Sequence, residues 1–143
     1  MGDPCDSAVL VSNRQDVPVD EERLAGLARR VLEGEGAWPA ELSVSFVTAE
    51  EMAGLHERYA GEPGPTDVLS FVIGEDDGDG CRVLGDVVVC PQVAAENNPD
   101  VAAELRLLLV HGILHLLGHD HESEAERAEM WARQGFYQET EVP

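Results

Sequence analysis

The chain has 143 residues, of which 43% are hydrophobic and 27% are charged, a balance typical of soluble globular proteins. This length predicts one domain, residues 1–143, with enough chain to bury a real core. The formal net charge is −20 and all nine cations are arginines, so the field of the protein counts against polyanionic partners at low salt. Either adaptation to a salt-rich cytoplasm or an acidic surface around a local basic or metal-lined cleft explains this charge.

No export signal and no membrane span are expected. Residues 1–20 contain four aspartates and no long apolar run, and no later segment reads as transmembrane. Cys5, Cys81 and Cys90 are widely spaced and form no CxxC pair. We therefore expect free thiols and a cytoplasmic location.

The first half of the chain predicts two strands and two helices. Residues 8–12 form a short apolar run, and residues 42–47 alternate as a half-buried strand does. Asp20 can cap a helix that runs to about residue 34, and Thr48 with Glu51 forms the capping box of a second helix. The side chains expected to face inward are Leu24, Leu27, Ala28, Val31 and Leu32 on the first helix, and Met52, Leu55 and Tyr59 on the second.

The second half adds two strands and three helices. Strands are predicted over residues 67–73 and 83–90, separated by an acidic, glycine-rich turn at 74–80. Gly85 marks a bulge or a close backbone approach, and Pro91 begins a short helix. A last amphipathic helix over 122–138 is expected to be anchored by Ala125, Ala128, Met130, Trp131 and Phe136. These elements predict a single-domain α+β fold, with about four strands in a mixed sheet and helices over it.

The stretch 104–121, ELRLLLVHGILHLLGHDH, holds four of the five histidines. Its leucines surround a helix almost completely, which predicts a central, buried helix. His111 and His115 are four residues apart, so they lie on one face of that helix. Gly118 can take a positive φ and end the helix, which lets the chain bring His121 back toward them.

A shared metal ion explains these histidines best. Unpaired imidazoles in a core cost free energy, and a cation that binds them removes that cost. His111, His115 and His121 are therefore predicted to bind one zinc ion per chain. The alternative, three hydrogen-bonded structural histidines, fits this spacing poorly. His119 and Asp120 are candidates for a fourth ligand or for orienting an imidazole.

Zinc held by three imidazoles leaves a position for water, whose pKa it lowers to about 7, and this predicts a hydrolase. Peptidases of the HExxH type need a glutamate where this chain has Gly112, so their general base is missing. The glycine is expected to leave room for something to approach the metal. Glu104 shares the histidine face, but it lies about 10 Å along the helix and is too distant to bind.

Three motifs resemble the YbeY family of bacterial endoribonucleases: HGILHLLGHDH, PTDVLSF at residues 65–71 and LGDVVVCP at residues 84–91. The resemblance covers about residues 42–131. It implies a metal-dependent endoribonuclease for single-stranded RNA that acts in 16S rRNA 3′-end maturation and ribosome quality control, in the cytoplasm. It also implies zinc on His111, His115 and His121, a catalytic role for His115, and the small ribosomal subunit with its assembly proteins as partners.

One departure from the family concerns an arginine thought to contribute to catalysis. Ala60 stands at its position here. Arg58 is the predicted catalytic substitute, although on a helix it points about 160° away from residue 60; a plain surface cation is the alternative. His56 projects at about 40° from residue 60 and is the other candidate for the cleft.

Several neighbouring residues have two readings. Ser70 and Phe71 either line the cleft or alternate between the faces of a strand, and Asp86 either supports the metal site or caps backbone. Thr66 and Asp67 are read as a turn and a strand cap. Two other functions stay open: a non-catalytic ribosome-assembly factor with a structural zinc, and a metallohydrolase of another substrate.

Overall fold

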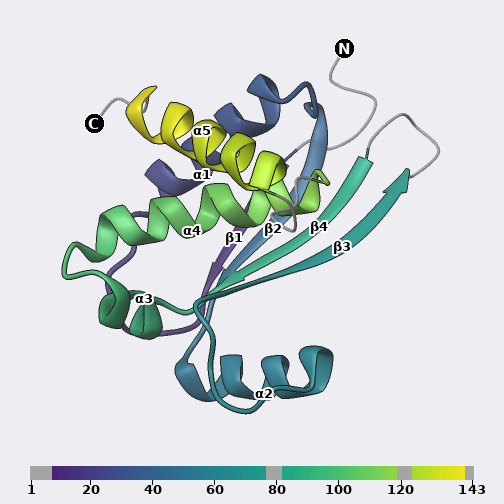
Figure 1. The fold of residues 1–143 in the computed structure, drawn as a ribbon. Helices are drawn as coiled ribbons and strands as arrows, with labels where there is room; N and C mark the ends of the chain where they lie inside the picture. The colour runs from purple at the N-terminus through teal and green to yellow at the C-terminus, as the bar shows by residue number, and fades with distance from the viewer. Residues whose placement is uncertain (1–7, 77–81, 119–123, 141–143) are drawn as a thin grey trace.

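The computed structural model describes residues 8–76, 82–118 and 124–140. Its centre is a four-stranded sheet in the order β1-β2-β4-β3 (Figure 1). Strands β1 (Ala8–Asn13), β2 (Ala40–Phe46) and β4 (Arg82–Val89) are parallel, and β3 (Val68–Asp76) runs antiparallel to β4 at one edge. The predicted α+β fold with a mixed sheet is confirmed.

Helices cover the two faces of the sheet unequally. Helices α1 (Glu21–Gly34), α4 (Val101–Leu116) and α5 (Glu124–Thr140) lie on one face, with the short α3 (Pro91–Asn97) beside the start of α4 (Figure 1). Helix α2 (Ala49–Ala60) lies on the other face (Figure 1). Helix α4 contacts α1, α3, α5 and the strands β3 and β4, so the histidine helix is central, as predicted. No helix among the described residues is both long and apolar enough to cross a bilayer.

Helix α1 forms where the sequence predicts it. The Asp20 carboxylate accepts a hydrogen bond from the backbone N–H of Arg23 at 3.1 Å, which satisfies one of the free donors of the first turn. All five residues expected to face inward are buried in the main core: Leu24, Leu27, Ala28, Val31 and Leu32. The apolar stripe of α1 therefore fixes how it lies on the sheet.

The β3–β4 pair contains the predicted irregularity. Gly85 has φ +144°, and a Cβ there would collide with the carbonyl oxygen of Phe71 on the paired strand. The register of the pair shifts between Val72 and Glu75. Strand β3 continues to Asp76 opposite Arg82, so the expected turn at residues 74–76 is wrong: the chain bulges at Gly74, which has φ +67°, and then Glu75 and Asp76 pair again with β4. Residues 77–80 of that turn lie outside the described residues.

Helix α2 and its side of the sheet form a smaller core. The predicted capping box is present, with the Thr48 hydroxyl accepting from the backbone N–H of Glu51 at 3.1 Å. Met52 is fully buried, but Tyr59 is 62% exposed, so the prediction that Tyr59 faces inward is wrong. Its ring instead packs edge-on against Phe71, with 5.0 Å between centroids. Cys90, in this core, is a buried free thiol.

Helix α5 packs through a different face from the one predicted. Met130 is buried as expected, but Trp131 and Phe136 are 63% and 59% exposed, and Ala125 is exposed as well. The buried residues are Met130, Gln134 and Tyr137. Polar contacts set this rotation, since polar residues are buried only where they find partners. Ala128, the remaining predicted anchor, is exposed too, so its prediction is also wrong.

A carboxylate on the loop after α1 holds the far end of α5. The Glu35 side chain, 7% exposed, accepts from both Arg133 at 2.7 Å and the Tyr137 hydroxyl at 2.5 Å. Burial, followed by this bond to Glu35, raises the pKa of the Tyr137 phenol. We call these three residues the α1–α5 clamp.

Candidate functional site

His111 and His115 lie one turn apart on α4, as predicted. Their rings are parallel to within 3°, with 6.5 Å between centroids. His111 is half-buried and His115 is exposed. The helix ends at Leu116, and Gly118 follows with φ +97°, so the predicted helix end is confirmed.

The third predicted ligand, His121, lies outside the described residues, as do His119 and Asp120. Within the described ranges, no group of three or more histidine, cysteine, aspartate or glutamate side chains is placed to hold a metal ion. The described part of the predicted site is therefore the pair of imidazoles on α4. The three-histidine site stays a prediction.

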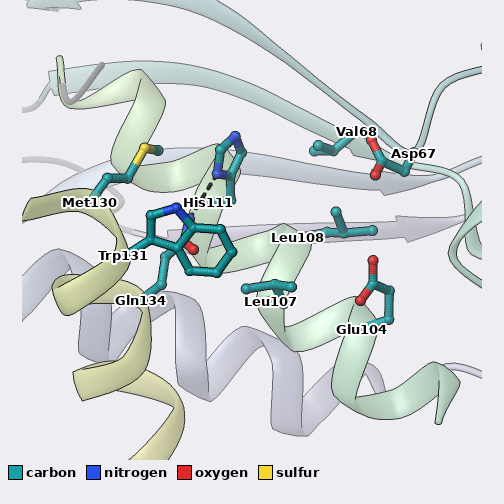
Figure 2. A pocket seen from close by; sticks show the side chains of 9 residues that line it. All are labelled: Asp67, Val68, Glu104, Leu107, Leu108, His111, Met130, Trp131 and Gln134. Atoms are coloured by element: carbon teal, nitrogen blue, oxygen red, sulfur yellow. Dashed lines mark hydrogen bonds between the residues drawn. The ribbon is translucent and has the colours of Figure 1, made fainter. Parts of the chain in front are cut away.

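Gln134 of α5 contacts the first of these imidazoles. Its side-chain nitrogen lies 2.8 Å from Nδ1 of His111, and the residue is only 4% exposed. Figure 2 shows Nδ1 directed toward Gln134 and the other ring nitrogen directed away from it. Sequence reasoning missed Gln134, because a glutamine on an amphipathic helix gives no local sign that it is buried against another helix.

A pocket of about 400 Å³ lies beside His111 (Figure 2). Residues at the start of β3, one side of α4 and the middle of α5 line it. Its walls are mainly apolar, with His111 and Gln134 together at one end and two carboxylates at the other, as Figure 2 shows. The lining residues are Asp67, Val68, Glu104, Leu107, Leu108, His111, Met130, Trp131 and Gln134.

One amide joins the two carboxylates of this pocket. Nδ2 of Asn97 donates to Oδ2 of Asp67 at 3.1 Å and to Oε2 of Glu104 at 3.3 Å. The carbonyl of Asp67 accepts from the backbone N–H of Cys90 at 2.9 Å. The backbone of Asp67 thus pairs at the start of β3, and its side chain lines the pocket.

Gly112 has a packing role that the sequence did not reveal. A Cβ at this position would lie 2.7 Å from Cγ1 of Val87 and 3.2 Å from the hydroxyl of Ser70. The Ser70 hydroxyl donates to the Gly112 carbonyl at 3.1 Å. The interpretation that Gly112 leaves room next to the metal is therefore wrong: the glycine lets α4 approach the sheet closely.

The residues near the sheet separate onto its two faces. Ser70 faces α4, whereas Phe71 and Asp86 line a second hollow beside α2, together with Arg14 and Tyr59. Ser70 and Phe71 therefore alternate between faces. Asp86 does not lie on the histidine side, so its expected support of the metal site is not found.

Arg58 and His56 also belong to the α2 side. The guanidinium of Arg58 is exposed and lies 6.0 Å from the centroid of the Tyr59 ring. His56 bonds the loop after its own helix, with Nδ1 2.9 Å from the Gly64 carbonyl oxygen and Nε2 3.4 Å from the Glu62 carboxylate. The fold does not bring these two residues to the imidazoles of α4, and the catalytic role of Arg58 stays a prediction.

Comparison with known proteins places this arrangement in a family. The sequence profile described as "Endoribonuclease YbeY" matches residues 10–140. The Thermobifida fusca protein named "Endoribonuclease YbeY" is 50% identical over 138 residues, covering 89% of each chain. The Beutenbergia cavernae protein of the same name is 52% identical over 132 residues, covering 85% of this chain and 88% of that one.

A solved structure agrees with these relatives. The solution structure of TM1509 from Thermotoga maritima superposes with a TM-score of 0.62 at 30% identity, covering 92% of this chain and 87% of that one. The histidine helix, the mixed sheet and the matched residues thus point to one assignment: this chain belongs to the Endoribonuclease YbeY family.

Proposed function

We propose that this protein is a zinc-dependent endoribonuclease specific for single strands, which acts in 16S rRNA 3′-end maturation and ribosome quality control in the cytoplasm. Membership of the Endoribonuclease YbeY family makes the chain a nuclease that hydrolyses phosphodiester bonds of RNA. The observation that carries the finer proposal is the pair of parallel imidazoles of His111 and His115 beside a pocket.

The donor set suits zinc. His111 and His115 present two imidazoles from successive turns of one helix, and imidazole is a preferred zinc ligand. We propose that these two and His121 hold one zinc ion per chain. When bound, zinc supplies a Lewis acid that polarises a phosphate oxygen and lowers the pKa of a water molecule.

The chain's own residues prepare the first of these ligands. Gln134 lies against Nδ1 of His111, and the amide of a glutamine can donate or accept depending on its orientation. A half-turn of the amide from the orientation drawn brings its oxygen to Nδ1; that nitrogen then carries the proton and the other ring nitrogen can bind a metal. Gln134 is thus a positioning residue for His111.

His115→Ala tests the proposal, because His115 is exposed and its loss should not disturb the core. The measurements are zinc content and cleavage of a single-stranded 16S rRNA fragment and of its duplex. Wild-type protein should bind one zinc and cleave only the single strand, and chelator or His115→Ala should abolish both zinc binding and cleavage. Glu57→Gln, an exposed position on α2, is the control. Cleavage that persists without zinc would reject the zinc proposal while leaving the nuclease assignment.

We also keep Arg58 as a proposed catalytic residue, with its own test. Because α2 and α4 lie on opposite faces of the sheet (Figure 1), an RNA strand that meets both must pass around the edge at β3. Arg58→Ala should then lower the cleavage rate by tenfold or more without changing zinc content, and Arg58→Lys should restore part of it. An unchanged rate for Arg58→Ala would assign Arg58 to the surface.

A further inference from the structure

We propose that the pocket beside His111 binds a guanine base of the RNA strand, so that the enzyme prefers a guanine near the cleaved bond. The inference rests on the proposed nuclease function and names a substrate feature that this function leaves open. The pocket is about 400 Å³, within the usual range of small-molecule sites. It shares His111 with the proposed metal site, so a base bound in it belongs to the strand at the histidines.

The pocket offers a stacking surface for a flat ring. Leu107, Leu108 and Met130 give it apolar walls, and Trp131 of α5 stands at its histidine end (Figure 2). Trp131 is 63% exposed, whereas tryptophan side chains are mostly buried on average. Its exposed ring is therefore available to stack on a ligand. Unpaired RNA bases are commonly recognised by stacking on such rings, and each stacked base contributes about 1–3 kcal/mol.

The opposite end of the pocket needs hydrogen-bond donors. Glu104 is only 9% exposed, and Figure 2 shows its carboxylate inside the pocket near Asp67. Among the described residues, no arginine or histidine donates to either carboxylate; the amide of Asn97 is shared between them, and the Thr66 hydroxyl donates to Asp67 at 3.4 Å. A buried carboxylate with unused acceptor positions is costly, so a ligand with N–H groups at its edge would bind there favourably.

Guanine is the base whose edge fits. Its N1–H and N2–H₂ groups point the same way and can donate together to one carboxylate, which accepts two parallel bonds. Uracil presents two carbonyl oxygens around a single N–H, and carbonyl oxygens facing Glu104 and Asp67 would be repelled. Recognition through an uncharged base also suits a protein of net charge −20, which does not attract phosphates from a distance.

Fluorescence of Trp131 provides a direct test. The chain has two tryptophans, so Trp38→Phe leaves Trp131 as the only one. In this background, guanosine should quench the fluorescence saturably, whereas uridine should bind at least tenfold more weakly. Glu104→Gln keeps the size and the bond to Asn97 but removes the acceptor charge, and it should weaken guanosine binding by roughly tenfold or more. Glu57→Gln makes the same change on α2 and should leave binding unaltered.

The nucleosides are uncharged, so the result does not depend on zinc or on phosphate contacts. Equal quenching by guanosine and uridine, or none by either, would overturn the proposal. Binding of argininamide without guanosine would do the same, because it would assign the pocket to a cationic side chain of a protein.

A second measurement separates this inference from the nuclease proposal. Uridine tracts with one guanosine should be cut near that guanosine, and replacing it with inosine, which lacks the N2 amino group, should reduce the preference. Trp131→Ala, at an exposed position, should reduce it too. Uniform cutting of all tracts would reject the guanine pocket and keep the nuclease, whereas guanosine binding without any cutting would do the reverse.

Discussion

The side-chain amide of Gln134 meets Nδ1 of His111 at 2.8 Å, so a residue of the last helix determines how a residue of the central helix presents its ring. A ring nitrogen held by such a bond fixes the tautomer of the imidazole. The two helices therefore build the proposed metal site together, although only α4 carries the histidines that the structure describes at this site.

This contact predicts that zinc affinity depends on Gln134. Gln134→Leu removes the partner of Nδ1 and should lower zinc affinity roughly 10–100-fold, the usual effect of removing a residue that orients a ligand. Gln134→Glu keeps an acceptor and should retain the affinity. Competition with a chromophoric chelator measures both, and Gln92→Leu on the exposed side of α3 is the control. Equal zinc affinities in wild type and the three variants would show that Gln134 contributes to packing and does not orient His111.

Gly112 predicts a stability loss at a position where helix propensity alone predicts a gain. In Gly112→Ala the new methyl group meets Val87 and Ser70, and overpacking of this kind costs about 1–3 kcal/mol. Gly54→Ala in the exposed interior of α2 meets nothing within 4 Å and should stabilise by about 0.5–1 kcal/mol. Urea unfolding measures the free energy of unfolding of both variants. A Gly112→Ala protein more stable than wild type would contradict the prediction, because it would mean that α4 can move away from the sheet.

The α1–α5 clamp predicts a loss of stability in alkali. Burial and the bond to Glu35 raise the pKa of the Tyr137 phenol above its ordinary value of 10.0, so the fold favours the neutral form. That contribution is complete below about pH 10 and is lost as the pH rises further. Tyr137→Phe should be less stable than wild type by about 1–2 kcal/mol near pH 8, and the difference should shrink by about pH 11. A constant difference would exclude the phenol as its source.

The net charge predicts that salt stabilises the fold. Twenty excess negative charges repel one another, and raising the ionic strength from about 0.1 M to about 1 M shortens the screening length from roughly 10 Å to roughly 3 Å. The thermal midpoint should therefore rise in potassium chloride, a salt that acts mainly by screening. A flat or falling midpoint would argue against adaptation to a salt-rich cytoplasm.

Local patterns predict what local forces determine. The apolar stripe of α1 identifies five buried residues, and the capping box at Thr48 identifies where α2 begins, because both depend on residues close in sequence. The spacing of His111 and His115 likewise predicts their shared face. Gly85 predicts an irregular strand because a glycine inside a strand usually accompanies a bulge or a close backbone approach.

The errors arise where distant contacts decide. Apolar character suggests that Trp131 and Phe136 anchor α5, but partners on other elements bury Gln134 and Tyr137 instead. The sequence suggests a place beside the metal for Gly112, because its neighbours Val87 and Ser70 come from two strands that the helix sequence does not reveal. Such residues can be found from a sequence only once the tertiary arrangement is known.

The α1–α5 clamp has a consequence for which residues of α5 can be exchanged. Glu35 holds Arg133 and Tyr137, while a neighbouring face of the same turns carries Met130, Trp131 and Gln134 to the pocket. The helix is thus fastened along one face and presents its pocket residues along the next. An exchange of Trp131 would therefore alter the pocket while the contacts of Glu35, and with them the seat of the helix, stay as they are.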